Sequence, residues 1–198
     1  MKLETVKGYY VTGELQEEFT VNEGGWKHGI YLCWRRTGQI WSESKYVNGL
    51  RHGTQRSWHD NGQLSNQGEW VNGNKHGTYQ EWYKNGQIWE QSEWLDWERN
   101  GTTQRWYDNG QIGEQSEWVK GNMHGTQYYW NNDGSYRYIT LYDNGKELIN
   151  VSYILANSRF RKVIKISIYG STIESTIFLA NITTMLRDEG CKYKIVQE

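Results

Sequence analysis

The sequence predicts a mainly β protein, in which β-hairpin repeats form a single-layer antiparallel sheet and a small C-terminal α+β unit follows. Three observations support this prediction. Tryptophan recurs with a fixed period of 24 residues, and Asn-Gly dipeptides separate segments of strand-forming residues. The composition combines 12 Trp and 22 Gly with no Pro, yet only 36% of the residues are hydrophobic. So few aliphatic side chains cannot fill a thick core, and burial must come from aromatic rings spread over a thin sheet.

Four sets of residues repeat between about residues 26 and 149, which we interpret as five copies of one unit. The first set is Trp34, Trp58, Trp82, Trp106 and Trp130. The second is Trp70, Trp94 and Trp118, with Tyr46 in the equivalent place. The third is His28, His52, His76 and His124, with Asn100 in the fourth copy and a Gly after each. The fourth is Gly38-Gln39, Gly62-Gln63, Gly86-Gln87 and Gly110-Gln111.

Each copy is predicted to contain two strands and two tight turns. In the third copy, residues 78–83 and 87–94 flank Asn85-Gly86, a dipeptide typical of a type I′ hairpin turn. A turn centred there places Trp82 opposite Trp89. The same arithmetic pairs Trp34 with Trp41, Trp58 with Ser65, and Trp106 with Gly113. A second turn, with Asn48-Gly49 and Asn72-Gly73 in the first two copies and Lys120-Gly121 in the fourth, then returns the chain. The repeat therefore predicts a meander that advances two strands per copy, with a ladder of rings on one face.

The rings of this ladder have two interpretations. Cross-strand aromatic pairs contribute roughly 0.2–1 kcal/mol each, so the ladder can stabilise a thin sheet in place of a core. Alternatively, the rings form a platform on which a ligand stacks. The candidate binding-face residues are Trp34, Trp41, Trp58, Trp82, Trp89, Trp106 and Trp130.

No catalytic residue, metal site or organic cofactor is expected. Histidines of successive copies lie about 9.5 Å apart in a sheet, too far to bind one ion. Cys33 and Cys191 are isolated, and acids such as Glu90 and Glu93 recur between copies, which favours a solvated stripe over a general acid and base. Stoichiometric zinc in metal analysis of the untagged protein would contradict this expectation.

The two ends differ from the repeats. Residues 1–25 contain a degenerate hairpin around residues 9–15 that we expect to cap the array. In the C-terminal unit, residues 150–198, the sequence predicts strands at 147–155 and 162–169, joined by a turn near Asn157-Ser158. A capping box at 171–174 then starts a helix near residues 172–188, with Gly190 after it and a last strand at 192–196. Such a helix would cover one face of the sheet and block an edge.

Charge and hydropathy limit the expected binding partners and the expected cellular location. The formal net charge of −1 gives no electrostatic argument for binding nucleic acid, and the basic excess of residues 151–198 is too small to suggest it. The first residues lack the apolar run of a secretory signal, and no stretch is apolar enough to span a membrane. We therefore expect a soluble, cytoplasmic protein.

The string from His76 to Ile88 resembles the MORN repeat in its bacterial and viral variant. The same pattern of His-Gly-Thr, Trp and Asn-Gly-Gln returns in the neighbouring copies, and the resemblance covers about residues 20–149. It implies an elongated, twisted, single-layer sheet used for binding or assembly, with no catalytic residue in the repeat. Asn100 departs from the pattern, and Trp97 replaces the expected turn Gly, so an irregular loop is expected between the third and fourth copies.

These observations lead us to expect a non-catalytic interaction or scaffold module that binds a protein partner or a second copy of itself. The resemblance leaves two narrower forms open: an antitoxin or immunity protein that neutralises a toxin, and a structural component of a viral or cellular assembly. A phospholipid- or glycan-binding module is a further alternative, although a membrane lipid is not favoured.

Overall fold

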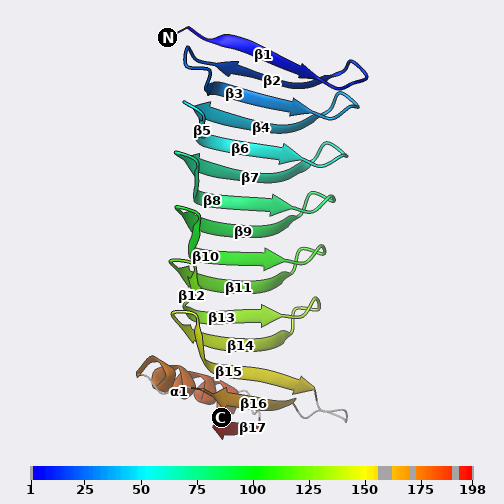
Figure 1. Ribbon diagram of the computed structural model, residues 1–198. Coiled ribbons are helices and arrows are strands. Elements are labelled where there is room, and N and C mark those ends of the chain that lie inside the picture. Colours follow the sequence, from blue (N-terminus) through cyan, green and yellow to red (C-terminus); the bar gives the residue numbers. More distant parts are fainter. Residues whose placement is uncertain (1, 156–161, 170–172, 189–191, 198) are drawn as a thin grey trace. The chain divides into compact units, whose positions relative to one another are not determined.

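The computed structural model describes residues 2–155, 162–169, 173–188 and 192–197. Its contacts divide the chain into two compact units, residues 1–99 and 100–198, which are described separately. Antiparallel β-hairpins dominate both units, and one helix is present in the second (Figure 1). The predicted fold class is therefore confirmed.

In the first unit each strand pairs antiparallel with the next along the chain, except that β5 and β6 both pair with β4. The strands are β1 (Glu4–Tyr9), β2 (Leu15–Val21), β3 (Lys27–Trp34), β4 (Ile40–Val47), β5 (Leu50–Arg51), β6 (Gly53–Trp58), β7 (Leu64–Val71), β8 (Asn74–Trp82) and β9 (Ile88–Leu95).

The division between the units falls within β10 (Glu98–Trp106). The second unit continues with β11 (Ile112–Val119), β12 (Asn122–Met123), β13 (Gly125–Trp130), β14 (Tyr136–Asp143), β15 (Lys146–Leu155), β16 (Lys162–Ile168), α1 (Ile173–Asp188) and β17 (Lys192–Gln197). The order strand, strand, helix, strand at the C-terminus agrees with the sequence prediction, and β17 pairs with β16 in parallel. The predicted turn at Asn157-Ser158, the start of the capping box and Gly190 lie outside the described residues.

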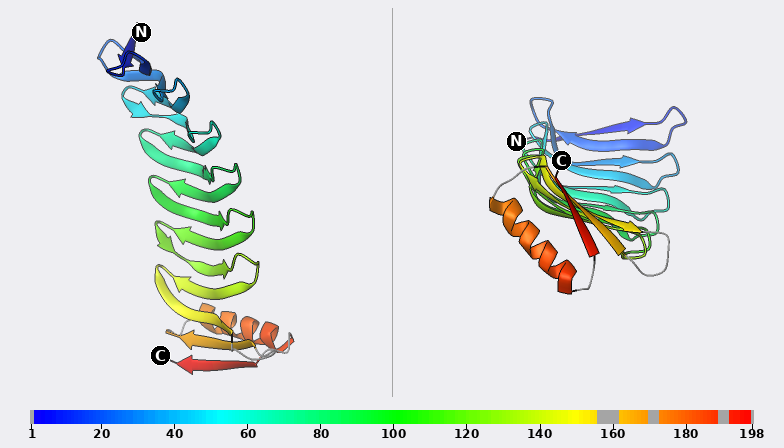
Figure 2. Two further views of the ribbon diagram at one scale, coloured as in Figure 1. Left: turned by 90° about the vertical axis from the view of Figure 1, so that its right-hand side faces the viewer. Right: turned by 90° about the horizontal axis from the view of Figure 1, so that it is seen from below.

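The helix covers one face of the strands at the end of the second unit, as expected (Figure 2). Ile182 of α1 is buried with a cluster of aliphatic residues on β14, β15 and β16, and Phe178 and Leu179 pack against it. The strand residues of this cluster are Ile139, Leu141, Leu148, Ile149, Val151 and Ile166. Aliphatic burial is therefore concentrated where a second layer exists.

The first turn of each hairpin is not the predicted type I′ turn. In the third copy the Gly86 N–H donates to the Tyr83 carbonyl at 2.9 Å, and the Tyr83 N–H donates to the Gln87 carbonyl at 2.8 Å. Gly86 has φ +85°, whereas Asn85 is not left-handed, so the loop has three residues: a type I turn followed by a left-handed Gly. The Asn85 side chain accepts a bond from the Gln87 N–H at 3.0 Å, which favours this loop over the two-residue turn.

The second turn is a two-residue type I′ turn, because both of its central residues are left-handed. Asn48 and Gly49 have φ values of 49° and 83°. Asp96 and Trp97 adopt the same conformation, with φ values of 50° and 73°. The irregular loop expected at Trp97 is therefore absent. The Trp97 ring packs edge-on against Trp70, with 4.7 Å between centroids, and this contact helps to hold an aromatic residue in a conformation that usually requires Gly.

The repeated histidine position lies beside this second turn. The N–H of Asn48 donates to His28 Nδ1 at 3.4 Å. In the fourth copy the equivalent donor is the Lys120 N–H, and Asn100 Oδ1 accepts it at 3.2 Å. Because His and Asn both offer a side-chain acceptor there, Asn100 preserves the interaction although it departs from the sequence pattern.

The N-terminal hairpin is more regular than its sequence indicates. Tyr10 and Glu14 close it with the same two backbone bonds that close the loops of the later copies. The following turn, from Asn22 to Trp26, has three residues rather than two, as its bonds Gly25 N–H to Asn22 and Asn22 N–H to Trp26 show. This one extra residue moves the first hairpin out of the 24-residue frame and explains why the repeat pattern fades before Trp26.

We predict that Asn100→Ala lowers the free energy of unfolding by about 0.5–1.5 kcal/mol, because the Lys120 N–H loses its acceptor. The control is Asn100→His, which restores the residue of the other copies and should stay close to the wild type. Urea unfolding of the three proteins measures the difference. Equal losses in both variants would contradict the assigned role.

Candidate interaction surface

In six of the described hairpins, one residue is left out of the strand pairing just after the three-residue loop. In β3–β4, Cys33 pairs with Ser42 and Trp34 with Ile40, so Trp41 has no partner. The residues skipped in this way are Gln16, Trp41, Ser65 and Trp89 in the first unit, and Gly113 and Arg137 in the second. Such a β-bulge bends the strand and redirects the side chain of the extra residue.

The bulge overturns the predicted cross-strand tryptophan pairs. Trp82 pairs with Ile88 instead of Trp89, and equivalent shifts occur at Trp34, Trp58 and Trp106. The predicted pairing was wrong only at the loop end, because the bulge returns the rest of each strand to the predicted register. The ring pairs of the first unit lie elsewhere, at Phe19–Tyr31, Tyr31–Tyr46 and Trp70–Trp97.

The seven candidate tryptophans therefore fall into two groups. Trp41 and Trp89 are bulge residues with exposed side chains, at 50% and 37% relative accessibility. Trp34, Trp58, Trp82, Trp106 and Trp130 end their strands and are half-buried. The carbonyls of four in this second group accept a side-chain bond from the preceding hairpin, donated by Tyr10, Arg35, His59 and Tyr107 at 2.7–2.8 Å. The strand-end tryptophans thus join successive hairpins, whereas the bulge tryptophans face solvent.

A hollow of about 340 Å³ lies among the bulges of the first unit. Trp41 and Trp58 line it, together with Ser57, Ser65, Asn66 and the charged or polar residues Arg35, His59, Asp60 and Lys84. The Arg35 guanidinium carbon lies 6.0 Å from the centre of the Trp41 ring, and its Nη2 donates to the Trp58 carbonyl at 2.7 Å. The structure thus brings two of the seven candidates together in one hollow.

A column of cations packed on aromatic rings is a second feature, which the sequence analysis missed. Lys27 Nζ lies 4.4, 4.0 and 5.6 Å from the ring centres of Phe19, Tyr31 and Tyr46. The equivalent residues of the next copies make similar contacts: Arg51 with Trp70, Lys75 with Tyr79 and Trp94, and Arg99 with Trp94. The sequence contains a signal for this column, because a basic residue directly precedes the repeated His or Asn in these four copies.

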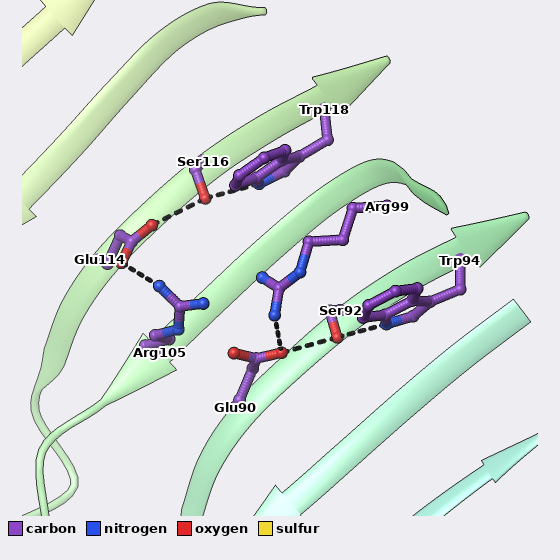
Figure 3. A network of polar contacts seen from close by, with 8 residues as sticks. All are labelled: Glu90, Ser92, Trp94, Arg99, Arg105, Glu114, Ser116 and Trp118. Atoms are coloured by element: carbon purple, nitrogen blue, oxygen red, sulfur yellow. Dashed lines mark hydrogen bonds and ion pairs between the residues drawn. The ribbon is translucent and has the colours of Figure 1, made fainter. Parts of the chain in front are cut away.

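Within this column a buried carboxylate links three side chains (Figure 3). Arg99 Nη2 donates to Glu90 Oε1 at 2.7 Å, and the Ser92 hydroxyl donates to the same oxygen at 2.9 Å. The Trp94 indole N–H donates to the Ser92 oxygen at 2.8 Å. The second unit has the same Trp-Ser-Glu chain at Trp118, Ser116 and Glu114. Its cation, Arg105, comes from the strand before Glu114, whereas Arg99 comes from the strand after Glu90.

The expected solvated stripe of acids is therefore wrong for Glu90, which is only 3% exposed. It is also wrong for the equivalent Glu114, whose side chain is 12% exposed, whereas Glu93 and its equivalent Glu117 are exposed, as predicted. Alternation along the strand explains the difference: Glu90 and Ser92 point to one face, and Glu93 points to the other.

The charged side chains of the cation column interact with Glu90 and with one another. Burial lowers the pKa of Lys75 to about 8 and raises the pKa of Tyr79, whose hydroxyl also bonds Glu81. Among the described residues, no three His, Cys, Asp or Glu side chains are placed to hold a metal ion. Likewise, no described helix is long and apolar enough to cross a membrane. The cluster stabilises the sheet by ion pairs, hydrogen bonds and ring contacts.

We predict that Glu90→Ala lowers the free energy of unfolding by on the order of 3 kcal/mol, because Arg99 keeps a largely buried charge without this carboxylate. Glu93→Ala, in the same strand but facing solvent, is the matched control and should cost no more than about 0.5 kcal/mol. Equal effects in urea unfolding would show that the two acids do not differ in environment.

We also predict that Lys75 makes stability depend on pH. The folded chain loses the Lys75 proton near pH 8, whereas the unfolded chain keeps it to about pH 10.4. The unfolded state therefore binds more protons above pH 8, and the stability contributed by this group rises with pH. Between pH 7 and pH 9 the wild type should gain stability relative to Lys75→Met. A constant difference between the two proteins over this range would contradict the prediction.

Comparison with known families agrees with this geometry. A family model described as "MORN repeat variant" matches residues 27–48, 51–72 and 75–96. Each match runs from the basic residue of the cation column to the first residue of the type I′ turn, and so covers one hairpin. No curated protein matches the chain. The first unit therefore contains three consecutive repeats of the MORN type.

Proposed function

We propose that this protein is a non-catalytic interaction module that binds another protein through the column of bulge residues in the first unit. We call this column, Gln16, Trp41, Ser65 and Trp89 with the hollow between them, the bulge surface. The observation that supports the proposal is the solvent exposure of Trp41 and Trp89 at equivalent positions of two copies. Tryptophan is among the residues most enriched at interface hot spots.

The spacing of the repeats suits an interface of ordinary size. Equivalent residues of successive copies lie two strands apart, about 9.6 Å, so Trp41 and Trp89 are separated by roughly 19 Å. A standard interface covers about 800 Å² on each partner, which is enough to include both rings and the hollow. The two rings can therefore contact one partner at the same time.

The charged groups of the first unit support a binding role rather than catalysis. Glu90, Arg99 and Lys75 are engaged with one another or with rings. MORN-type repeats also contain no catalytic residues of their own. The narrower forms of the proposed function are an antitoxin or immunity protein of a bacterial or viral system, and a component of an assembly. The identity of the captured partner distinguishes between them.

The test of the proposed function is the double variant Trp41→Ser with Trp89→Ser. Because Ser65 already occupies the same bulge in the second copy, we expect folding to be preserved while partner binding falls at least tenfold. The partner is first captured on the wild-type protein by crosslinking in native lysate, and its affinity for each variant is then measured with purified components.

The matched control is Ile30→Ser, which removes an equally exposed hydrophobic side chain from a position outside the bulge surface. It should leave binding unchanged. If the double variant kept full affinity while Ile177→Ser, on the exposed side of α1, lost it, the C-terminal unit would be the binding surface and the proposal would be wrong.

A further inference from the structure

We infer that the hollow at Ser65 receives an aromatic side chain of the protein partner, next to a carboxylate of the same partner. This inference rests on the proposed function and specifies the chemistry of its partner. The hollow is lined by Trp41, Trp58, Ser65, Arg35 and Lys84, together with Ser57, His59, Asp60 and Asn66.

The repeat itself indicates what the hollow accommodates. Ser65 is the bulge residue of its hairpin, and in the hairpins before and after it this residue is Trp41 and Trp89. The three loops close with the same backbone bonds, from Arg35 to Gln39, His59 to Gln63 and Tyr83 to Gln87. The backbone at Ser65 therefore has the geometry that presents an indole in both neighbouring copies. The second copy lacks only the ring.

The hollow is large enough to hold an aromatic ring. Its volume of about 340 Å³ falls within the 300–1,000 Å³ of sites that hold whole small molecules. The half-buried Trp58 ring and the exposed Trp41 ring supply apolar walls, against which another aromatic ring packs favourably.

The charges around the hollow favour an acidic neighbour to that ring. Arg35 and Lys84 are opposed by Asp60 alone, so the lining has an excess of one positive charge when His59 is neutral. Lys84 and Asp60 form an ion pair at 2.9 Å with both side chains more than half exposed. Such a pair contributes little and can be exchanged for a partner carboxylate.

The flanking residues favour a protein segment over a small free molecule. Trp41 and Trp89 precede and follow Ser65 in the same column and are both exposed. An occupant that fills the hollow and also covers these rings must extend along several copies. An extended segment with an aromatic residue beside Asp or Glu meets these requirements.

The experiment uses a displayed library of random peptides, selected on the full-length wild-type protein. We expect the enriched peptides to share an aromatic residue with Asp or Glu adjacent to it or two positions away. Ser65→Trp, which fills the hollow from within, should weaken their binding at least tenfold. Ser65→Ala, the matched control, removes the hydroxyl but leaves the hollow open and should bind like the wild type.

The fold of Ser65→Trp is checked separately by its circular dichroism and unfolding midpoint, which should match the wild type because Trp41 and Trp89 occupy equivalent bulges. Lys84→Gln provides a second test that does not fill the hollow: it should weaken acidic peptides severalfold and leave their uncharged Asn or Gln analogues unaffected. Enriched peptides without an aromatic residue, equal binding to Ser65→Trp, or no enrichment at all would overturn the inference.

The result also separates this inference from the proposed function. If the partner binds Ser65→Trp at full strength but fails to bind the Trp41→Ser and Trp89→Ser double variant, the bulge surface is the interface and the hollow is not a receptor. If the partner binds both variants at full strength, the proposed function fails as well.

Discussion

A sheet without a second layer has to cover its own backbone, and the side chains of the first unit are arranged to do this. Residues 2–99 form strands and turns alone. Small residues occupy the strand centres, and larger side chains lie over them: a Cβ at Gly68 would stand 2.4 Å from the Tyr79 ring. Ser92 is fully buried in this way. The cation column and the buried Glu90–Arg99 pair follow from the same requirement, because long amphipathic side chains cover area that aliphatic residues cannot. In the second unit the helix provides a second layer, and buried aliphatic side chains form a core there.

At the loop end of each hairpin, the residue that bonds the neighbouring hairpin differs from the residue that is redirected by the bulge. The strand-end tryptophans give their carbonyls to bonds between hairpins, so their positions are constrained. The bulge residue has no partner in the strand register and varies between copies as Gln, Trp, Ser, Trp, Gly and Arg. At two places the residue after the strand-end tryptophan lies next to the bulge residue: Arg35 beside Trp41, and Tyr107 beside Gly113. A fixed scaffold thus presents a variable column, which is the arrangement expected of a binding surface.

The period of 24 and the Asn-Gly turns were sufficient to predict the hairpins and the two strands of each copy, and the capping box predicted the helix. The loop type was not predictable from Asn85-Gly86 alone, because the Asn85 side chain bonds the Gln87 N–H and lengthens the loop by one residue. That one residue changed every predicted tryptophan pair at the loop end. The burial of Glu90 and the exposure of Glu93 could have been predicted from strand alternation, had the basic residues at 75 and 99 been placed on the same face. The hollow at Ser65 depends on the bulge and could not be predicted without the structure.

In the first unit the bulge tryptophans face solvent, whereas the rings of the strand-end tryptophans are half-buried. Fluorine NMR of protein labelled with 5-fluorotryptophan tests this most directly, with resonances assigned by single Trp→Phe variants and broadened by a soluble paramagnetic reagent. We expect strong broadening for Trp41 and Trp89, at 50% and 37% exposure, and weak broadening for the half-buried Trp34, Trp58 and Trp82. Equal broadening of the two groups, or stronger broadening of the strand-end tryptophans, would contradict it.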